Sequence, residues 1–380
     1  LSVNTTSNGA NGSQWIDEAD GLVSLNLNAG GGSVQVSSGA AIEDNDIDQD
    51  VTAAAIDFIA SSGIGALGAI QISETTLNAR SDAGDVQLTA SGQLTVEVVD
   101  ALGAGAQVVL MTLAGDVLID SVQSNAAIEI VSAGAINELG DDAAEDLTSG
   151  SLTLTADTGV GNAGTIESAV DFLSVQTNSG GIDLLNLGVL FVNGATVAVS
   201  GGISIATTSP MIISGDVRAP GDVLLDAREI SDAPVWGDDL IVKAAVTVES
   251  TDAGVTLRAG DDLILEVGST IGAAGLMTLA GGFEDTDGGA SASLLGTIHA
   301  NGGLSVFTLG DLTLGEIISN GQTVELTTQN GRILDGNGGG VLNITAATLM
   351  ARAALGIALG IALDTAVSNL DLSTDAGDIE

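Results

Sequence analysis

The stretch that decides the fold runs from Gly134 to Leu184 and reads GAINELGDDAAEDLTSGSLTLTADTGVGNAGTIESAVDFLSVQTNSGGIDL. It opens with Ile136, which is followed two residues later by an acid. Equivalent openings begin at Ile42, Ile230 and Ile333, so that the four isoleucines are 94, 94 and 103 residues apart. The sequence therefore contains a long internal repeat.

A finer repeat lies within the long one. Short segments alternate aliphatic and polar residues, as in VQLTA from Val86 and VTLRA from Val255, and this alternation predicts half-buried β-strands. Successive strands begin at Val86, Val108 and Ile128, so the pattern returns after a nearly constant step. A step of about 20 residues is too short for a helical crossover between parallel strands and matches one coil of a β-solenoid.

Two architectures compete for a repeat of this length: one parallel β-solenoid with about 20–22 residues per coil, or tandem Ig-like β-sandwich domains of about 100 residues each. The chain has only two Trp, five Phe and three Pro, whereas sandwiches usually bury an aromatic residue in each domain. Its 53 glycines punctuate every stretch, which suits the tight corners of a solenoid. We therefore predict an all-β solenoid, including the two Ala-rich, helix-compatible segments Val51–Ile70 and Ile344–Leu363.

We expect one continuous solenoid over residues 1–380, as a segment of a longer chain. Its super-repeats are residues 42–135, 136–229, 230–332 and, in part, 333–380, with residues 1–41 as the end of a preceding copy. The sequence starts and stops within repeat-like segments, so we expect further repeats of the same chain, or end-to-end self-association, beyond both termini. The longest apolar tract, Ala354–Leu363, is too short to span a bilayer.

Composition narrows the possible partners. Fifty acids against seven bases give a formal net charge of −43, which disfavours nucleic acid and anionic membrane surfaces. The absence of Cys rules out disulfides and thiol chemistry. A content of 45% hydrophobic residues is nevertheless ample for a large core, built from aliphatic side chains.

Several motifs together resemble the repeats of filamentous-haemagglutinin-type adhesins and related giant bacterial surface proteins. They are the GAI-x-(D/E) opening, the LTLTADTGVG and TIESAVDFLSVQT segments, and a return of the form S/T-x(2)-G-D/G-I/V, found in variants at Ser81–Val86, Asn178–Ile182 and Ser373–Ile379. The resemblance implies a right-handed parallel β-helix, exported and displayed at the bacterial cell surface. It also implies attachment to cell-surface glycans or to another cell, or a place in an extracellular fibre. The NPNGI signature of two-partner secretion is missing, so the likeness does not extend to a secretion route.

Enzymatic chemistry has little support. His299 is the only histidine, which removes triads with a histidine base and histidine-rich metal sites, and we expect it to be an exposed turn residue. A polysaccharide lyase or hydrolase with this fold needs clustered acids and bases, and aromatic platforms for sugars, yet the chain has no Tyr. We predict no enzyme. The best local candidate for such a site comprises Arg218 and Arg228 with Asp216, Asp222 and Asp226.

Calcium is the one cofactor for which the sequence offers candidate ligands. The tract EDNDIDQD places alternate carboxylates where they can converge on one side of a loop, although it lacks the central Gly and terminal Glu of an EF-hand. These candidates are Asp44, Asp46, Asp48 and Asp50. Similar acidic tracts occupy Leu139–Asp146, Trp236–Asp239 and Gly282–Gly289. Two interpretations stay open: a solvated acidic turn that needs no ion, and a Ca²⁺ site.

We thus predict a non-enzymatic structural and adhesive shaft of a large secreted or surface-displayed repeat protein. The alternative is a calcium-stiffened subunit of a surface layer or filament. Trp15 and Trp236 each precede an acidic turn, and we expect both to plug coil corners and not to bind sugar.

Overall fold

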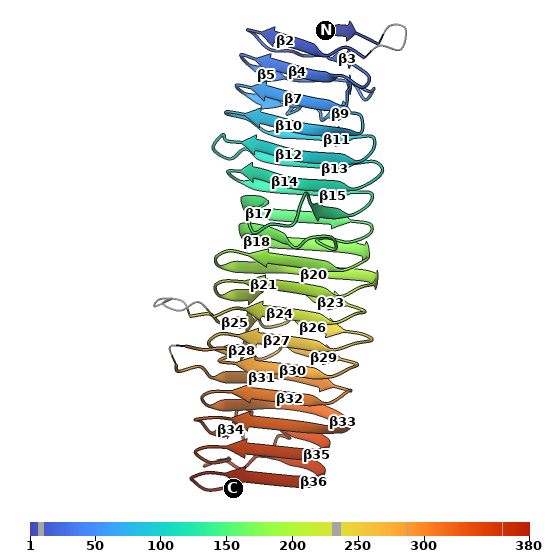
Figure 1. The fold of residues 1–380 in the computed structure, drawn as a ribbon. Helices are drawn as coiled ribbons and strands as arrows, with labels where there is room; N and C mark the ends of the chain where they lie inside the picture. Colours follow the sequence, from blue (N-terminus) through green and yellow to red (C-terminus); the bar gives the residue numbers. More distant parts are fainter. Residues whose placement is uncertain (7–10, 230–236, 287, 359) are drawn as a thin grey trace. The chain divides into compact units, whose positions relative to one another are not determined.

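The computed structural model describes residues 1–6, 11–229, 237–286, 288–358 and 360–380. The chain divides into two compact units, Leu1–Leu185 and Asn186–Glu380. Within the described residues every regular element is a β-strand, and the strands form a parallel β-solenoid of about 17 turns in all (Figure 1). The predicted fold class is confirmed. Since all the described strand pairings are parallel, the alternative of tandem sandwiches, which are antiparallel, is wrong.

The strands are mostly short, as expected for coils with tight corners. Those of the first unit are β1 (Ser2–Asn4), β2 (Gln14–Glu18), β3 (Asn26–Asn28), β4 (Ser33–Ser38), β5 (Ala41–Ile42), β6 (Val51–Thr52), β7 (Ala55–Ala60), β8 (Gly63–Ile64), β9 (Ile70–Ile72), β10 (Thr75–Ser81), β11 (Val86–Ala90), β12 (Leu94–Ala101), β13 (Gln107–Thr112), β14 (Val117–Ser124), β15 (Ala127–Ser132), β16 (Ile136–Glu138), β17 (Leu147–Ala156), β18 (Ile166–Ser179) and β19 (Ile182–Asn186).

The last residue of β19, Asn186, is the first of the second unit, which continues the same pattern. Its strands are β20 (Leu190–Ser200), β21 (Ile203–Thr207), β22 (Met211–Ile213), β23 (Val217–Ala219), β24 (Val223–Ala227), β25 (Leu240–Val242), β26 (Thr247–Ser250), β27 (Val255–Ala259), β28 (Leu263–Leu265), β29 (Thr270–Ala273), β30 (Met277–Gly281), β31 (Ala292–Ala300), β32 (Leu304–Thr308), β33 (Leu312–Thr328), β34 (Ile333–Asp335), β35 (Ile344–Ala353) and β36 (Thr365–Thr374).

The core consists of ladders in which one aliphatic side chain stacks on its equivalent in the next coil. Val86 lies opposite Val108, and Val108 lies opposite Ile128, as the spacing in the sequence predicts. All three side chains are buried. Each contributes about 1.5–3 kcal/mol by leaving water. The second unit has the same kind of ladder, through Ile203, Val223, Val255, Met277, Leu304 and Val324.

The two helix-compatible segments are also part of the coils. Val51–Ile70 contains β6, β7 and β8 and the first residue of β9, and the segment from Ile344 begins with β35. In both segments the alternate side chains of the longer strand are buried, as in its neighbours. The prediction that they are solenoid is confirmed for the residues that the structure describes.

The corners explain the recurring S/T-x-x-G motif. The Ser81 side chain is buried, and its hydroxyl oxygen accepts a hydrogen bond from the N–H of Gly84 at 3.0 Å. In the second unit the Thr328 hydroxyl donates to the carbonyl oxygen of Gly331 at 2.8 Å. Glycine is required at the fourth position because a Cβ at Gly331 would lie only 2.1 Å from the Gly310 backbone.

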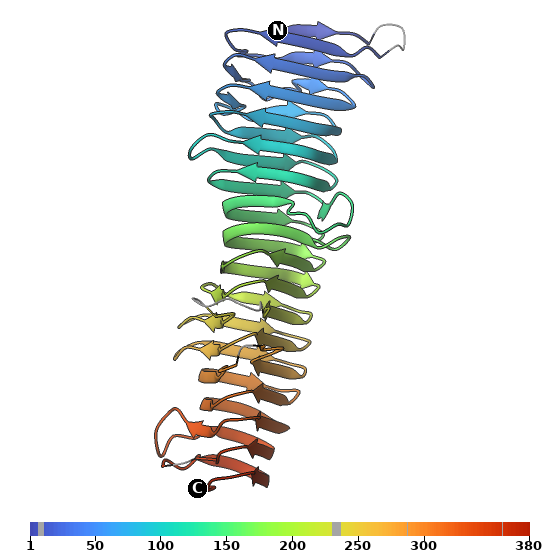
Figure 2. The same cartoon turned by 60° about the vertical axis from the view of Figure 1, so that its left-hand side comes forward.

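Some coils are longer than the basic step, and their extra residues form loops between the strands. Ile128 pairs with Leu152, and Val324 pairs with Leu349, and both pairs are further apart in the sequence than Val86 and Val108. The inserted residues lie between β16 and β17 in the first case, and between β34 and β35 in the second. Figure 2 shows both loops beside the stacked strands, one in the green region of the first unit and one in the orange-red region of the second. The coil template therefore tolerates insertions at this position.

Candidate metal site in the acidic loops

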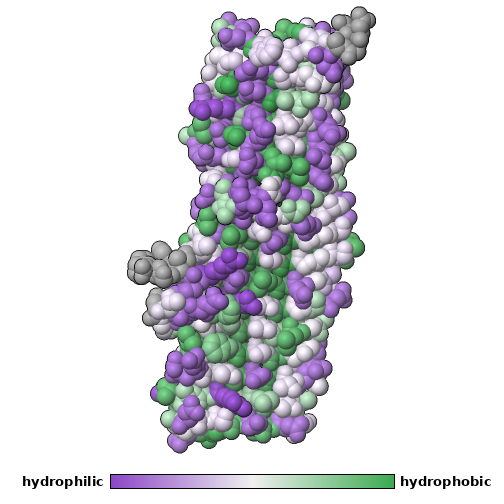
Figure 3. Space-filling view, viewed as in Figure 1, coloured by the Kyte–Doolittle hydropathy of each residue, from purple (hydrophilic) through white to green (hydrophobic). Residues whose placement is uncertain are grey.

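Acids on the strands avoid one another. In the described strand pairings, no Asp or Glu lies opposite another Asp or Glu. Asp57, for example, lies between Gln35 and Asn78, and Asp226 lies opposite Arg258. Like charges directly opposite each other destabilise a sheet, so this arrangement reduces repulsion along the coils. On the face shown in Figure 3, hydrophilic side chains are accordingly interspersed with neutral and hydrophobic ones.

Acids gather instead in the loops and at the strand residues beside them. Among the described residues, three groups bring one carboxylate oxygen from each of three acids within 4.8 Å of the others. Two of these groups follow the openings at Ile42 and Ile136. The opening at Ile230, with Asp232, lies outside the described residues. The groups are Asp44, Asp46 and Asp50; Glu138, Asp146 and Glu167; and Glu229, Asp261 and Asp285.

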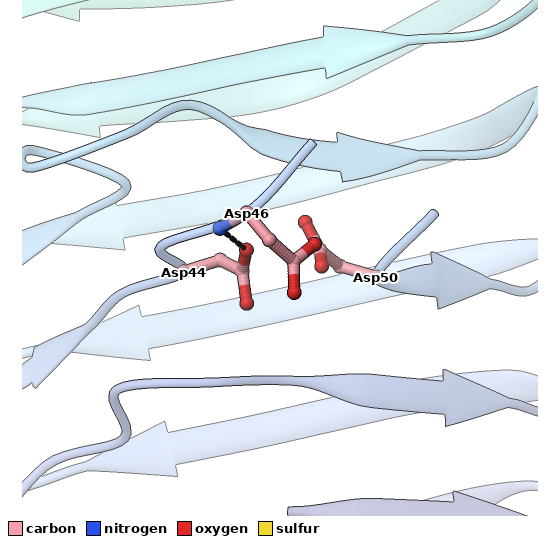
Figure 4. Close-up of side chains that lie close together, drawn as sticks. All are labelled: Asp44, Asp46 and Asp50. Atoms are coloured by element: carbon pink, nitrogen blue, oxygen red, sulfur yellow. Dashed lines mark hydrogen bonds between the residues drawn. The ribbon is translucent and has the colours of Figure 1, made fainter. Parts of the chain in front are cut away.

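The first group contains three of the four predicted calcium ligands, and Figure 4 shows their carboxylates close together. Asp44 and Asp50 are buried, whereas Asp46 is exposed. Asp48 is also exposed and is not part of the group, although its N–H donates to Asp46 Oδ1 at 2.9 Å. Calcium binding by these residues stays a prediction.

Backbone donors already occupy much of this group. Asp44 accepts hydrogen bonds from the N–H of Leu25 at 3.2 Å and of Asp46 at 2.8 Å. Asp50 Oδ2 accepts one from the N–H of Gln71 at 2.7 Å. Burial still raises the pKa of Asp50 to about 7, and the neighbouring Asp44 and Asp46 add to the rise. An ionised Asp50 is therefore costly without a positive partner.

The second group is more deeply buried. Glu138 ends β16, Asp146 lies immediately before β17, and Glu167 is in β18 of the following coil. Their exposed fractions are 6%, 3% and 8%. Asp146 Oδ2 accepts a hydrogen bond from the N–H of Glu167 at 2.9 Å, and Glu138 Oε1 accepts one from the N–H of Asp142 at 2.7 Å.

Two oxygens of this second group have no partner. Glu138 Oε2 and Glu167 Oε2 are buried and make no hydrogen bond within the described part of the chain. Burial, together with the charges of Glu138, Glu167 and Asp142, raises the pKa of Asp146 to about 8. Burial and Glu138 also raise the pKa of Glu167. The group thus favours either bound protons or a bound cation.

The place of Glu167 in this group was not predicted from the sequence. This residue belongs to the TIESAV segment, whose pattern is that of an ordinary strand. Its signal is the coil step: Glu167 lies 21 residues after Asp146, at the position that stacks beside it in the next coil. Gln71 has the same relation to Asp50, so a single repeat unit does not disclose whether an acid will be there.

A third copy of the loop, after Ile333, has an amide in place of the buried acid. Asn343 precedes β35 as Asp146 precedes β17, and its side chain is completely buried. Its Nδ2 lies near four oxygens: Asp335 Oδ1 at 2.8 Å, Asn337 Oδ1 at 3.0 Å, and the carbonyls of Leu314 at 3.1 Å and Gly315 at 3.3 Å. The amide therefore supplies the positive end of a dipole to an oxygen-lined space.

The third acidic group, in the second unit, is more open. Glu229, Asp261 and Asp285 are all only half-buried. The Thr286 hydroxyl donates to Glu229 Oε1 at 2.8 Å, and the N–H of Asp238 donates to Asp261 Oδ2 at 2.8 Å. Without a deeply buried member this group resembles the solvated acidic turn of the other interpretation.

The arginines do not form a shared site. Arg218 pairs with Asp216 at 3.3 Å and with Glu249 at 3.9 Å, and Arg228 pairs with Asp226 at 3.4 Å. No ion pair in the described residues joins these two sets. Asp222 is engaged elsewhere, since its Oδ1 accepts the N–H of Gly254 at 2.8 Å.

Two single-residue predictions need correction. Trp15 does not plug a corner: it lies in β2 and is 74% exposed, because Gln14 takes the inward position of that strand. His299 is exposed as predicted, but it lies in β31 and not in a turn. Trp236 lies outside the described residues.

One surface feature was not foreseen. In the second unit a groove of about 430 Å³ is lined almost entirely by apolar side chains. Phe191, Ile212 and Ile241 stack there on the outward faces of β20, β22 and β25, where alternation predicts polar residues. The groove residues are Val189, Phe191, Pro210, Ile212, Asp239 and Ile241.

Comparison of the chain with family models, with curated proteins and with solved structures gives no match. The fold alone places the chain in the class of parallel β-solenoids. In the described residues there is no helix with the length and apolar character needed to cross a membrane.

Proposed function

We propose that this chain is a segment of a non-enzymatic structural and adhesive shaft, from a large bacterial repeat protein that is secreted or displayed at the cell surface. The observation that carries the proposal is the continuity of the buried ladders from coil to coil within each unit, as in Val86, Val108 and Ile128. Each coil presents the next with the same aliphatic surface, so coils can be added by duplication without a new core.

The distribution of charge supports this proposal. Acids that alternate with neutral partners along the strands cover the outward faces with solvated groups, which discourages sideways aggregation of the sheets. The candidate catalytic arginines, Arg218 and Arg228, are each engaged in separate ion pairs at the surface. The alternation of inward aliphatic and outward polar residues thus provides both the stacking of coils and the solubility that a shaft needs.

Localisation tests the proposal. Antibodies raised against the 380-residue chain should label intact cells of the organism that makes it, and immunogold particles should lie on extracellular material. A deletion strain should attach less well to its natural surface and lose the label. Labelling that requires lysis of the cells, or a deletion strain with unchanged attachment, would contradict the proposal.

One observation favours the calcium-stiffened filament or surface-layer subunit as a second candidate. Glu138 Oε2 and Glu167 Oε2 are buried without partners in an acidic group. A subunit of this kind should assemble in calcium and disassemble when a chelator is added. Sedimentation velocity in about 1 mM Ca²⁺, within the affinity range of extracellular calcium modules, and in excess EGTA separates the two candidates. Unchanged sedimentation supports the plain shaft.

A further inference from the structure

We propose that Glu138, Asp146 and Glu167 bind one Ca²⁺, which clamps the loop between β16 and β17 to the following coil. The proposal concerns a site within one chain and does not depend on the shaft function. Its ligands come from three places: the end of β16, the last residue of the loop, and β18 one coil further on. Only Asp146 lies in a tract that the sequence marks as acidic.

The spacing of the oxygens fits one ion. The three carboxylate oxygens lie within 4.8 Å of one another. Calcium holds oxygens at about 2.3–2.6 Å, so two ligands on opposite sides of one ion are about 4.6–5.2 Å apart. Two of the six carboxylate oxygens accept backbone N–H groups, so water or a backbone carbonyl would complete the shell of six to eight oxygens that Ca²⁺ accepts.

The neighbourhood leaves room beside Glu138. A Cβ at Gly164 would lie 2.7 Å from Glu138 Oε2 and 3.4 Å from the Gly140 carbonyl oxygen. Gly164 therefore keeps this side of the carboxylate free of a side chain. The Gly140 carbonyl oxygen faces the same position and is a candidate for a further oxygen ligand.

The unpartnered oxygens are an independent indication of a ligand. A buried carboxylate without a hydrogen bond or a counter-charge carries a large desolvation cost. Glu138 and Glu167 are both more than nine-tenths buried, and each has one oxygen without a partner. None of the ion pairs in the described part of the chain includes Glu138, Asp146 or Glu167. Of the three acidic groups in the described residues, this trio is the one in which every member is buried.

Asn343 shows what the same position does without an ion. Asn343 Oδ1 accepts the N–H of Asp364 at 3.0 Å, just as Asp146 Oδ2 accepts the N–H of Glu167 at 2.9 Å. In both loops the backbone carbonyl of this residue also accepts an N–H at 2.7 Å from the preceding coil. The two loops share these hydrogen bonds to the backbone, and they differ in the other polar atom of the side chain. Asn343 places an N–H donor among oxygens, whereas Asp146 places another oxygen there, so the positive charge must come from a bound species.

Calorimetric titration with CaCl₂ tests the proposal on the whole chain after treatment with EDTA. The variants are Asp146→Asn, which copies the amide of the third loop, and Glu167→Gln. The matched control is Asp141→Asn, an exposed acid in the same loop. We expect wild type and the control to bind one more equivalent of Ca²⁺ than either variant, and to bind Ca²⁺ more tightly than Mg²⁺. Equal stoichiometry in wild type and both variants, or preference for Mg²⁺, would overturn the proposal.

Hydrogen exchange of the wild-type chain gives a readout that needs no variant. Calcium should slow amide exchange in the peptide that covers Leu139–Asp146 by at least several-fold, because the ion ties both ends of this exposed loop to β18. Exchange at the same rate with and without Ca²⁺ would overturn the clamp, and it would do so even if a variant failed to fold.

Discussion

Asp146 and Asn343 occupy the same position in two different coils. Each directly precedes a strand, and each accepts the N–H of the residue 21 positions later, at 2.9 Å for Asp146 and 3.0 Å for Asn343. The two side chains differ in one atom. Asp146 has a second carboxylate oxygen, which lies among other carboxylates, whereas Asn343 has the amide nitrogen Nδ2, which lies among oxygens. The coil template thus holds its loops with the same backbone bonds while the chemistry inside the loop changes.

The side-chain amide of Asn343 should contribute measurably to the free energy of unfolding of the second unit. Replacement of Asn343 by Asp removes the donor and adds a buried charge near Asp335, so we expect a loss of about 2–3 kcal/mol in the free energy of unfolding at neutral pH. Urea unfolding in EDTA measures it, with Asn301→Asp, an exposed change in the same unit, as the control. A loss no greater than that of the control would contradict this interpretation of the loop.

The metal-free chain should become less stable as the pH rises from about 4 to 8. Asp50 and Asp146 have pKa values of about 7 and about 8 in the folded chain, well above those of an unfolded aspartate. The folded state therefore binds more protons over this range, and its stability is greatest below about pH 4 for these two groups and is lost as they ionise. Melting temperatures in EDTA across this range measure the effect. The double variant Asp50→Asn, Asp146→Asn should have a shallower pH dependence, and an unchanged slope would refute the assignment.

The corner glycines should tolerate no side chain. A Cβ at Gly331 would stand 2.1 Å from the backbone of Gly310, so Gly331→Ala should destabilise the second unit by about 1–3 kcal/mol. The control is Gly339→Ala, where the nearest atom to the added Cβ is 3.8 Å away and the backbone needs no left-handed conformation. Thermal unfolding followed by circular dichroism compares the two, and similar melting temperatures would show that the corners can relax.

Salt should stabilise the chain. The net charge of −43 is spread over the outward faces and loops, where repulsion between acids is screened over about 30 Å at 0.01 M salt and about 10 Å at 0.1 M. We expect the melting temperature in EDTA to rise between these NaCl concentrations at pH 7.5, and to rise less at pH 4.5, where many carboxylates carry protons. A flat response at pH 7.5 would show that the charges already lie too far apart to matter.

The sequence was a good guide to what repeats. Alternation and the nearly constant step between strands correctly placed Val86 opposite Val108 and Val108 opposite Ile128, because every coil must satisfy the same aliphatic ladder. The sequence was a poor guide to features that occur in a single coil. Trp15 faces outward because Gln14, the residue before it, takes the inward position in β2. A shift of one residue exchanges the two faces of a strand.

Only part of the candidate metal site could be predicted from the sequence. The acidic tract that ends at Asp146 is visible in the sequence, but the tract at Asp44–Asp50 is equally acidic and has fewer unpartnered oxygens. What separates the two loops is the residue one coil later, Glu167 against Gln71, together with burial. Both depend on the register between coils, which a pattern within one coil does not contain. Continuity of the solenoid over residues 1–380 and the right-handed coil stay predictions.

Stretching single chains by their two ends tests the shaft most directly. A stack held mainly by contacts between neighbouring coils should resist force and then lose coils one after another. Each lost coil, of about 20–22 residues, should release about 70–80 Å of contour length. Force–extension curves with a series of such steps would support a structural shaft. A featureless extension at low force, like that of an unfolded chain, would contradict it.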